Sequence, residues 1–298
     1  MIQDIAPWHL DNAFYPVEPD DADLLLDLTA EGILLADDMQ RLPTFGEWRT
    51  WDVSAEASPV YAFRLLPDTN AHPSSPEQET SDHERQIRFF LALRKPEITF
   101  PLPEGWQRVA PSALRALSGP LPLVAATALH LFRWYDTHRF CGRCGSSLCL
   151  AHDERALRCP SCGEVDYPVI PPCVIVAVID HDRLLLTRYA RPGASRYVLV
   201  AGFVEIGETA EQAAAREVME ETGLRVKNLR YAGSQPWGLS GTLAAGFTAE
   251  LDGSDEIRLD TSELAEAVWM KRDEIPLCPD ASSLTMDMIL RFSRGELS

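Results

Sequence analysis

Four glutamates and one arginine in a short stretch of the chain have the types and spacing to do chemistry. Glu208 closes a glycine-containing loop. Glu217, Glu220 and Glu221 follow at i, i+3 and i+4, which places their carboxylates on one face of a helix. A solvated acidic face is the plain alternative. Clustered carboxylate oxygens are, however, what Mg²⁺ or Mn²⁺ needs, and these ions pair with substrate phosphates. Arg216 is placed to pair with a carboxylate of the loop.

Two Cys-x-x-Cys-Gly motifs, separated by 14 residues, form a second chemical cluster. Their cysteines are Cys141, Cys144, Cys159 and Cys162. Zn²⁺ takes four thiolates in a tetrahedron, and each motif turns two sulfurs toward one metal. With four protein ligands no coordination position stays open for chemistry, so we expect a structural zinc. The alternative, a thiol redox pair, is disfavoured by the repeat of the motif.

Helix signals surround the glutamates. Thr209 followed by Gln212 is a capping-box start, and Gly223 is a helix stop. The helix between them is predicted to have about 13 residues. Ala214 and Val218 define a neighbouring apolar face that packs inward.

The chain has 298 residues, with 45 acidic and 27 basic side chains and a net charge of −18. That balance argues against general binding to nucleic-acid backbones, which requires lysine and arginine. The first residues lack the features of a secretory signal. The most apolar run, 121–132, is shorter than the roughly 20 residues of a membrane span. We therefore expect a cytoplasmic protein with no membrane partner.

The length suggests two or three domains. We expect a β-rich N-terminal domain with a helical linker, a zinc ribbon and an α/β (α+β) domain, at residues 1–137, 138–168 and 169–298. Apolar spacing predicts helices near 112–117 and over 121–137. Apolar runs at 173–179 and 184–186 predict strands of the last domain.

The stretch 202–224 fits the Nudix box, Gx5Ex7REUxEExGU with U aliphatic, at every specified position. The sequence resembles the NADH pyrophosphatase branch of Nudix hydrolases, which also carries a four-cysteine zinc ribbon before the Nudix domain. Residues 234–237, Ser-Gln-Pro-Trp, are similar to the start of a motif of that branch. The resemblance covers roughly residues 130–280, and over residues 1–110 it rests on domain order alone. It implies a Nudix fold with a mixed sheet between helices.

The resemblance also implies roles for the acidic residues. Glu217 and Glu221 are the implied main ligands of Mg²⁺ or Mn²⁺, and Glu220 assists. Ala201 offers its backbone carbonyl to a metal. Glu263 aligns with a distal glutamate that binds metal or acts as a base, and Glu266 is its rival. The implied structural positions of the box are Gly202, Glu208, Arg216 and Gly223, although Glu208 is alternatively an outer metal ligand.

Substrate contacts are implied for three aromatic residues and one loop. Phe203 and Trp237 are candidates for stacking on nicotinamide or adenine, and Tyr167 matches a substrate-contacting tyrosine. The alternative for each is a core position. The expected substrate loop consists of Gln235, Pro236, Trp237, Gly238, Leu239, Ser240, Gly241 and Thr242. The branch motif usually continues Pro-Phe-Pro-x-Ser, whereas this chain reads Gly-Leu-Ser-Gly-Thr, so we expect a more flexible loop.

The implied reaction is the metal-dependent hydrolysis of the pyrophosphate of NAD(H) to NMN(H) and AMP by a homodimer. Removal of NAD caps from RNA 5′ ends is an implied extension. One alternative is a Nudix pyrophosphatase for ADP-ribose or a dinucleoside polyphosphate. A different class, a zinc-ribbon binding module with an inactive Nudix fold, is disfavoured by the intact glutamates.

Overall fold

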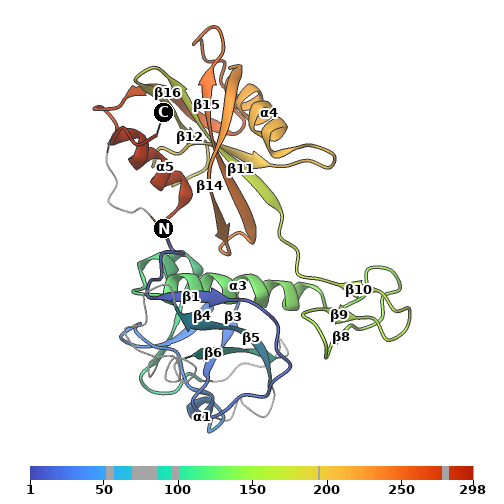
Figure 1. Cartoon of the computed structure of the whole chain (residues 1–298). Coiled ribbons are helices and arrows are strands. Elements are labelled where there is room, and N and C mark those ends of the chain that lie inside the picture. The colour runs from blue at the N-terminus through green and yellow to red at the C-terminus, as the bar shows by residue number, and fades with distance from the viewer. Residues whose placement is uncertain (52–56, 69–85, 95–100, 194, 277–281, 298) are drawn as a thin grey trace, which may run out of the picture. The chain divides into compact units, whose positions relative to one another are not determined.

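The computed structural model describes residues 1–51, 57–68, 86–94, 101–193, 195–276 and 282–297. The chain divides into two compact units. One unit comprises residues 2–169 with 238–240, and the other comprises residues 170–237 and 241–298 with Met1. Each unit has its own sheets and its own apolar core, so each is described by itself (Figure 1).

Two small sheets account for the β-rich character of the N-terminal unit. One has the order β1-β5-β6-β2, with strands Trp8–Asp11 (β1), Ala57–Pro67 (β5), Ile87–Arg94 (β6) and Leu24–Leu26 (β2). The other has the order β3-β4-β7, with strands Leu28–Thr29 (β3), Gly32–Ala36 (β4) and Trp106–Val109 (β7). A short helix, α1 (Phe45–Trp48), begins at a capping box formed by Thr44 and Glu47.

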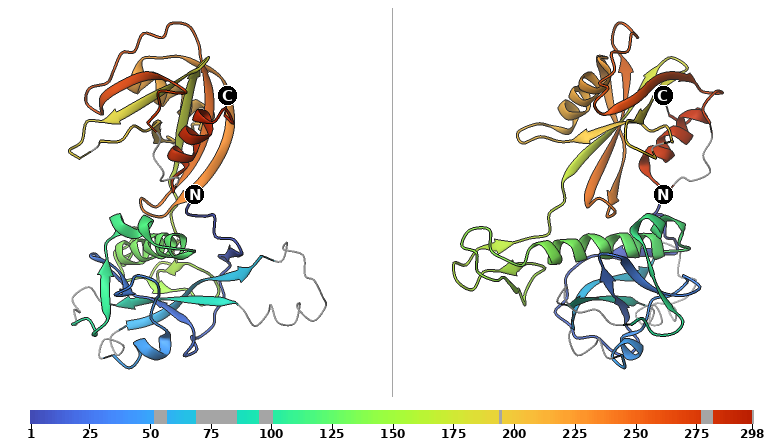
Figure 2. Two further views of the ribbon diagram at one scale, coloured as in Figure 1. Left: turned by 90° about the vertical axis from the view of Figure 1, so that its left-hand side faces the viewer. Right: turned by 180° about the vertical axis from the view of Figure 1, so that it is seen from behind.

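One long helix, α3, spans Leu121–Thr137, as the apolar spacing predicts (Figure 2). Its buried side chains, among them Val124 and Ala128, join the core formed with the strands. The helix expected near 112–117 is instead a 3₁₀ helix, η2, at Pro111–Ala116. Six residues that begin with a proline and are followed by an extended residue are too few to offset the cost of nucleating an α-helix.

The zinc ribbon adds a three-stranded sheet to the same unit. Its strands are Cys149–Leu150 (β8), Leu157–Arg158 (β9) and Val165–Asp166 (β10), in the order β10-β9-β8. All pairings are antiparallel. The strands have only two residues each, so this sheet presents little apolar surface for a core of its own.

The second unit is built on one mixed sheet with the order β14-β15-β11-β12-β16, and β13 pairs with β11 beside this path. Its strands are Pro172–Asp180 (β11), Arg183–Tyr189 (β12), Val200–Phe203 (β13), Val226–Trp237 (β14), Thr242–Leu251 (β15) and Leu264–Lys271 (β16). The β11–β15 pair is parallel and the other pairs are antiparallel. The apolar runs predicted as strands lie in β11 and β12.

Two helices cover opposite faces of this sheet (Figure 1). On one face α4 (Ala210–Thr222) buries Ala214 and Val218 completely. On the other, α5 (Leu284–Ser293) buries Met288 and Phe292. The expected mixed sheet between helices is therefore present. No helix within the described ranges has the length and apolar character needed to cross a membrane.

Candidate active site

Strand β13 and helix α4 position the glutamate cluster. The capping box begins α4: Thr209 Oγ1 accepts from the N–H of Gln212, and Gln212 Oε1 accepts from the N–H of Thr209. Gly223, with a φ of +69°, ends the helix in the left-handed conformation that favours glycine. The predicted 13-residue helix is present with both of its terminal signals.

Gly202 in β13 gives Glu217 the room it occupies. A Cβ built on Gly202 would lie 1.9 Å from Cδ of Glu217, and both carboxylate oxygens would be within 2.2 Å. No side chain fits in that space. The glycine of the box therefore lets the Glu217 carboxylate rest directly on the backbone of the neighbouring strand.

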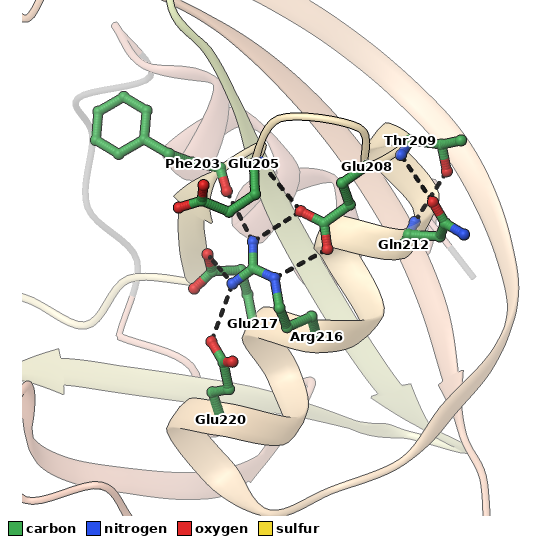
Figure 3. Close-up of polar contacts among 8 residues, drawn as sticks. All are labelled: Phe203, Glu205, Glu208, Thr209, Gln212, Arg216, Glu217 and Glu220. Carbon is green, nitrogen blue, oxygen red and sulfur yellow. Dashed lines mark hydrogen bonds and ion pairs between the residues drawn. The ribbon is translucent and has the colours of Figure 1, made fainter.

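Arg216 ties the loop and the helix together through every donor it has (Figure 3). Its Nε and Nη2 donate to the two carboxylate oxygens of Glu208, each at 2.9 Å. Nη1 donates to Glu217 at 2.8 Å and to Glu220 at 2.9 Å. Nη2 also donates to the carbonyl of Phe203 at 2.9 Å. An arginine has five N–H donors, so none is left for another partner.

Burial separates the glutamates of α4. Glu221 is 3% exposed, whereas the side chain of Glu220 is 59% exposed. Burial, followed by the charges of Glu217 and Glu263, raises the pKa of Glu221 to about 8. Burial also raises the pKa of Glu217. The hydrogen bonds from Arg216 instead lower the pKa of Glu208.

The segment between β15 and β16 brings Glu263 to the same place. The N–H of Asp260 donates to the carbonyl of Glu221 at 3.0 Å. Glu263 follows three residues later, and its charge raises the pKa values of both Glu221 and Glu217. Its rival, Glu266, lies in β16 and is paired with Arg188 at 2.9 Å. The contacts of Glu266 are therefore with an arginine of β12.

One buried glutamate oxygen is suited to contact a divalent cation. Oε2 of Glu221 is buried and has no hydrogen-bond partner among the described residues. A buried carboxylate oxygen without a donor is costly unless a proton or a metal neutralises it. Hard oxygen donors of this kind suit Mg²⁺ or Mn²⁺. The backbone of Ala201, paired with Ile175 in the adjacent strand, stands directly before Gly202.

The four cysteines of the ribbon form a separate, compact cluster, with their sulfurs within 4.8 Å of one another. Its two turns are built alike. The N–H of Gly145 donates to the carbonyl of Cys141 at 2.8 Å. Gly163 makes the same contact with Cys159 at 3.0 Å. Both glycines have φ near +76°, a conformation that L side chains rarely adopt.

The surroundings of Cys144 favour its thiolate, whereas, against the backbone hydrogen bond of Glu164, desolvation and the hydrogen bonds with the other three cysteines raise the pKa of Cys162. Hydrogen bonds with the side chain and backbone of Ser146 lower the pKa of Cys144 to about 6. Four sulfur donors at these separations suit tetrahedral zinc and leave it no open position. The ribbon is therefore a structural zinc site.

Models of two domain families match the chain at the two clusters. A NUDIX domain matches residues 169–288, and an NADH pyrophosphatase zinc ribbon domain matches residues 136–167. Residues 169–288 are a NUDIX domain. The glutamate cluster lies within this NUDIX domain, and the four clustered cysteines lie within the ribbon.

Curated relatives are similar to this chain over part of its length. The chain is 45% identical over 166 residues to the NAD-capped RNA hydrolase NudC of Salmonella heidelberg (strain SL476), and equally to that of Salmonella typhi. These alignments cover 56% of this chain and 64% of each relative. The chain thus spans less than two thirds of the length of these relatives. A solved NUDIX hydrolase from Nitrosomonas europaea is 26% identical with a TM-score of 0.46, covering 52% of this chain and 90% of that chain.

The aromatic residues with expected substrate roles lie in different surroundings. Phe203, at the end of β13, is 56% exposed, and only its carbonyl is bonded to Arg216. Trp237 is half-buried at the end of β14. Tyr167 belongs to the N-terminal unit, is 54% exposed and donates from its hydroxyl to Glu154 at 3.0 Å. None of the three is a fully buried core residue.

The expected substrate loop is shorter than predicted. Pairing of β14 with β15 continues to Trp237 and Thr242, so residues 235–237 and 242 belong to strands. Gly241, with a φ of +77°, closes the turn. Residues 238–240 group with the N-terminal unit. The backbone ladder continues because strand pairing satisfies the donors and acceptors that a long loop would leave open.

Gln235 is occupied by structural contacts. It is 2% exposed, donates to the carbonyl of Ser282 at 3.0 Å and accepts from the N–H of Leu284 at 2.7 Å. Its amide thereby holds the first residue of α5 against β14.

Two residues near the glutamates were not expected from the sequence. Burial, and then the charge of Glu221, raises the pKa of Tyr189 at the end of β12. The charge of Asp260 also raises the pKa of Glu221. The acidic spacing of Asp260 and Glu263 could have indicated the second residue. A tyrosine at a strand end gives no comparable signal.

Proposed function

We propose that this protein hydrolyses the pyrophosphate of NAD(H) to NMN(H) and AMP with a divalent cation, and that it removes NAD caps from RNA 5′ ends. The observation that carries the proposal is the buried, unpartnered Oε2 of Glu221 inside a NUDIX domain. The zinc ribbon of the NADH pyrophosphatase type and the name of the curated relatives support the choice of substrate.

In this proposal Glu217, Glu221, Glu263 and the carbonyl of Ala201 hold Mg²⁺ or Mn²⁺, and Glu220 assists. A divalent cation there supplies charge neutralisation for the pyrophosphate and lowers the pKa of bound water. Arg216 fixes the orientation of the Glu217 carboxylate. The oxygen of a water molecule forms the new bond to phosphorus while the bond from phosphorus to the bridging oxygen breaks. Glu263 is the candidate to accept the proton of that water.

The remaining assignments complete the proposal. Phe203 and Trp237 stack on the bases, and Tyr167 with residues 235–242 contacts the substrate. The chain is divided at residues 1–137, 138–168 and 169–298, works as a homodimer and resides in the cytoplasm. The use of four cysteines as zinc ligands supports a reducing compartment.

A hydrolysis screen tests the function. Purified protein is incubated with Mg²⁺ or Mn²⁺ and with NADH, NAD, ADP-ribose, dinucleoside polyphosphates or NAD-capped RNA, and the products are separated by chromatography. We expect NMN(H) and AMP from NAD(H), and no product after removal of the divalent cation. Intact NADH under all conditions would refute the proposal.

The Gly-Leu-Ser-Gly-Thr segment at 238–242 favours a second candidate, a pyrophosphatase for another nucleoside diphosphate derivative. Cleavage of ADP-ribose or a dinucleoside polyphosphate with NADH left intact would support it. Absence of hydrolysis from every substrate, together with retained fold and zinc, would instead indicate an inactive binding module.

A further inference from the structure

The NUDIX site must hold an anionic substrate among carboxylates, so the basic residues around it matter. Arg216 has all five N–H donors bonded to the loop and helix. Arg188 donates through Nε and Nη2 to Glu266. Both guanidinium groups are therefore already paired with carboxylates. A third arginine, Arg191, stands at the same end of β12.

Backbone contacts place Arg191 beside the glutamates. Tyr189, the last residue of β12, pairs with Leu264. The N–H of Ala190 donates to the carbonyl of Glu263 at 2.8 Å. Arg191 is therefore one residue from a hydrogen bond to the backbone of Glu263.

The side chain of Arg191 lies over the ring of Tyr189, with Cζ 5.1 Å from the ring centroid. The charges of Glu221, Arg191 and Glu263 all act on the Tyr189 hydroxyl. Arg191 is exposed and makes no ion pair with any described residue. Stacking fixes the guanidinium plane while the N–H donors on its rim stay available.

The other end of β12 offers a matched contrast. Arg183 lies over the ring of Trp269 at 5.2 Å, a similar stack. Arg183 is paired with Asp180 and also with Asp255, the latter at 2.9 Å. A stacked arginine thus lies at the first residue of β12 and another lies two residues after its last. Of the two, only the arginine beside the glutamates lacks a carboxylate partner among the described residues.

We propose that Arg191 binds a non-bridging phosphate oxygen of the substrate's pyrophosphate. Arg191 is a substrate-binding residue in this assignment, and Tyr189 is the positioning residue that holds its guanidinium. The inference rests on the proposed function, because it assumes a pyrophosphate bound at the glutamates. Guanidinium groups form bidentate, charge-assisted hydrogen bonds with phosphates that an ammonium group reproduces only in part.

The test compares Arg191→Gln, Arg191→Lys and the control Arg183→Gln. Each glutamine variant removes one stacked arginine, and the two arginines lie near opposite ends of β12. For NADH hydrolysis we expect Arg191→Gln to raise KM about 10-fold with kcat within twofold, as expected for one charged hydrogen bond at an exposed site. Arg191→Lys recovers part of the loss. Arg183→Gln leaves both constants unchanged.

Calorimetric titration with inorganic pyrophosphate and Mg²⁺ provides a second measurement that does not need turnover. Arg191→Gln should weaken pyrophosphate binding about 10-fold relative to Arg183→Gln. Equal affinities in these two variants would overturn the role of Arg191, even if NADH is hydrolysed normally. Conversely, a wild-type protein that binds pyrophosphate through Arg191 but leaves NADH intact would refute the proposed function alone.

Discussion

Glu221 occupies a position that disfavours its charged form, and this has a consequence for stability. Its pKa is 4.5 in an unfolded chain and about 8 in the folded protein without a divalent cation. The folded state therefore binds an extra proton between these values. The stability gained from that proton is fully present below pH 4.5, falls steadily as the pH rises above 4.5, and is fully lost once the pH has risen through 8.

Replacing Glu221 with glutamine removes this titration. In buffer without Mg²⁺ or Mn²⁺, we expect the Tm of Glu221→Gln to exceed that of wild type, and to do so by several degrees more at pH 9 than at pH 6. Its hydrolytic rate should fall about 1,000-fold, because the proposed ligand of the catalytic cation is lost. Differential scanning calorimetry and product assays measure the two effects.

Glu220→Gln is the control for this pair of effects, since Glu220 is one position away and largely exposed. It should show no pH-dependent gain in Tm and a smaller loss of rate. A Tm difference for Glu221→Gln that is the same at pH 6 and pH 9 would contradict the burial argument.

A double-mutant cycle at Gly202 and Glu217 tests the inference that no side chain at position 202 fits beside the Glu217 carboxylate. Gly202→Ala places a Cβ 1.9 Å from Cδ of Glu217, so one of the two must move. We expect at least a 100-fold loss of hydrolysis and a lower Tm. In a Glu217→Ala background the clash is absent, so Gly202→Ala should then have little effect on Tm. Additive losses in this double-mutant cycle would show that the two residues do not interact.

Helix α4 carries three of the glutamates, and its first turn sets their register. Thr209→Ala removes the side-chain oxygen that accepts from Gln212. Loss of an N-cap of this kind costs about 1 kcal/mol. We expect the free energy of unfolding of the NUDIX domain to fall by this amount in urea titrations, with a moderate loss of kcat.

The chain provides a matched control, because α1 begins at a second capping box with Thr44. Thr44→Ala should destabilise the N-terminal unit to a similar degree and leave kcat unchanged. Equal losses of kcat in both variants would indicate that capping affects activity through general stability alone.

Local signals in the sequence were sufficient to predict α4, because capping side chains and a terminal glycine act within one or two turns. They placed Glu217, Glu220 and Glu221 on one face but did not rank their burial. That ranking depends on the segment around Asp260, which is bonded to the carbonyl of Glu221 and lies far along the chain. Periodicity carries no information about such a contact.

The substrate segment shows the same limit at the level of strands. Motif similarity marked residues 235–242 as a unit, whereas pairing divides them between β14, a turn and β15. The contacts of Gln235 with Ser282 and Leu284 join residues nearly fifty positions apart. Only the folded sheet and α5 bring these groups together, so spacing alone could not predict them.

At the scale of the whole molecule, zinc joins parts of the ribbon that have little core of their own. The strands β8, β9 and β10 have two residues each. Structural zinc contributes folding free energy directly in such modules.

We expect one zinc per chain by elemental analysis, and loss of ribbon structure after treatment with a zinc chelator, measured by hydrogen exchange. Cys173→Ser is a control outside the cluster, whereas Cys159→Ser should abolish zinc binding. An unchanged exchange pattern after zinc removal would support a thiol role instead.

The distribution of charge over the chain predicts how an RNA substrate is recognised. Residues 1–137 hold 21 acidic and 10 basic side chains, and the whole chain has a charge of −18. A protein that contacts several backbone phosphates loses affinity steeply with salt, because each contact releases counterions. The excess of acidic over basic side chains disfavours such contacts, so we expect the NAD cap to supply the binding energy. We expect the ratio of KM for NAD-capped RNA to KM for NADH to change less than about twofold between 50 and 200 mM KCl. Dividing by the KM for NADH removes the salt dependence of the site itself, including that of any contact with Arg191. Capped RNAs of about 10 and 100 nucleotides should give the same KM. A ratio that rises tenfold or more with salt, or a KM that falls with RNA length, would show that the RNA backbone is bound despite the acidity of the chain.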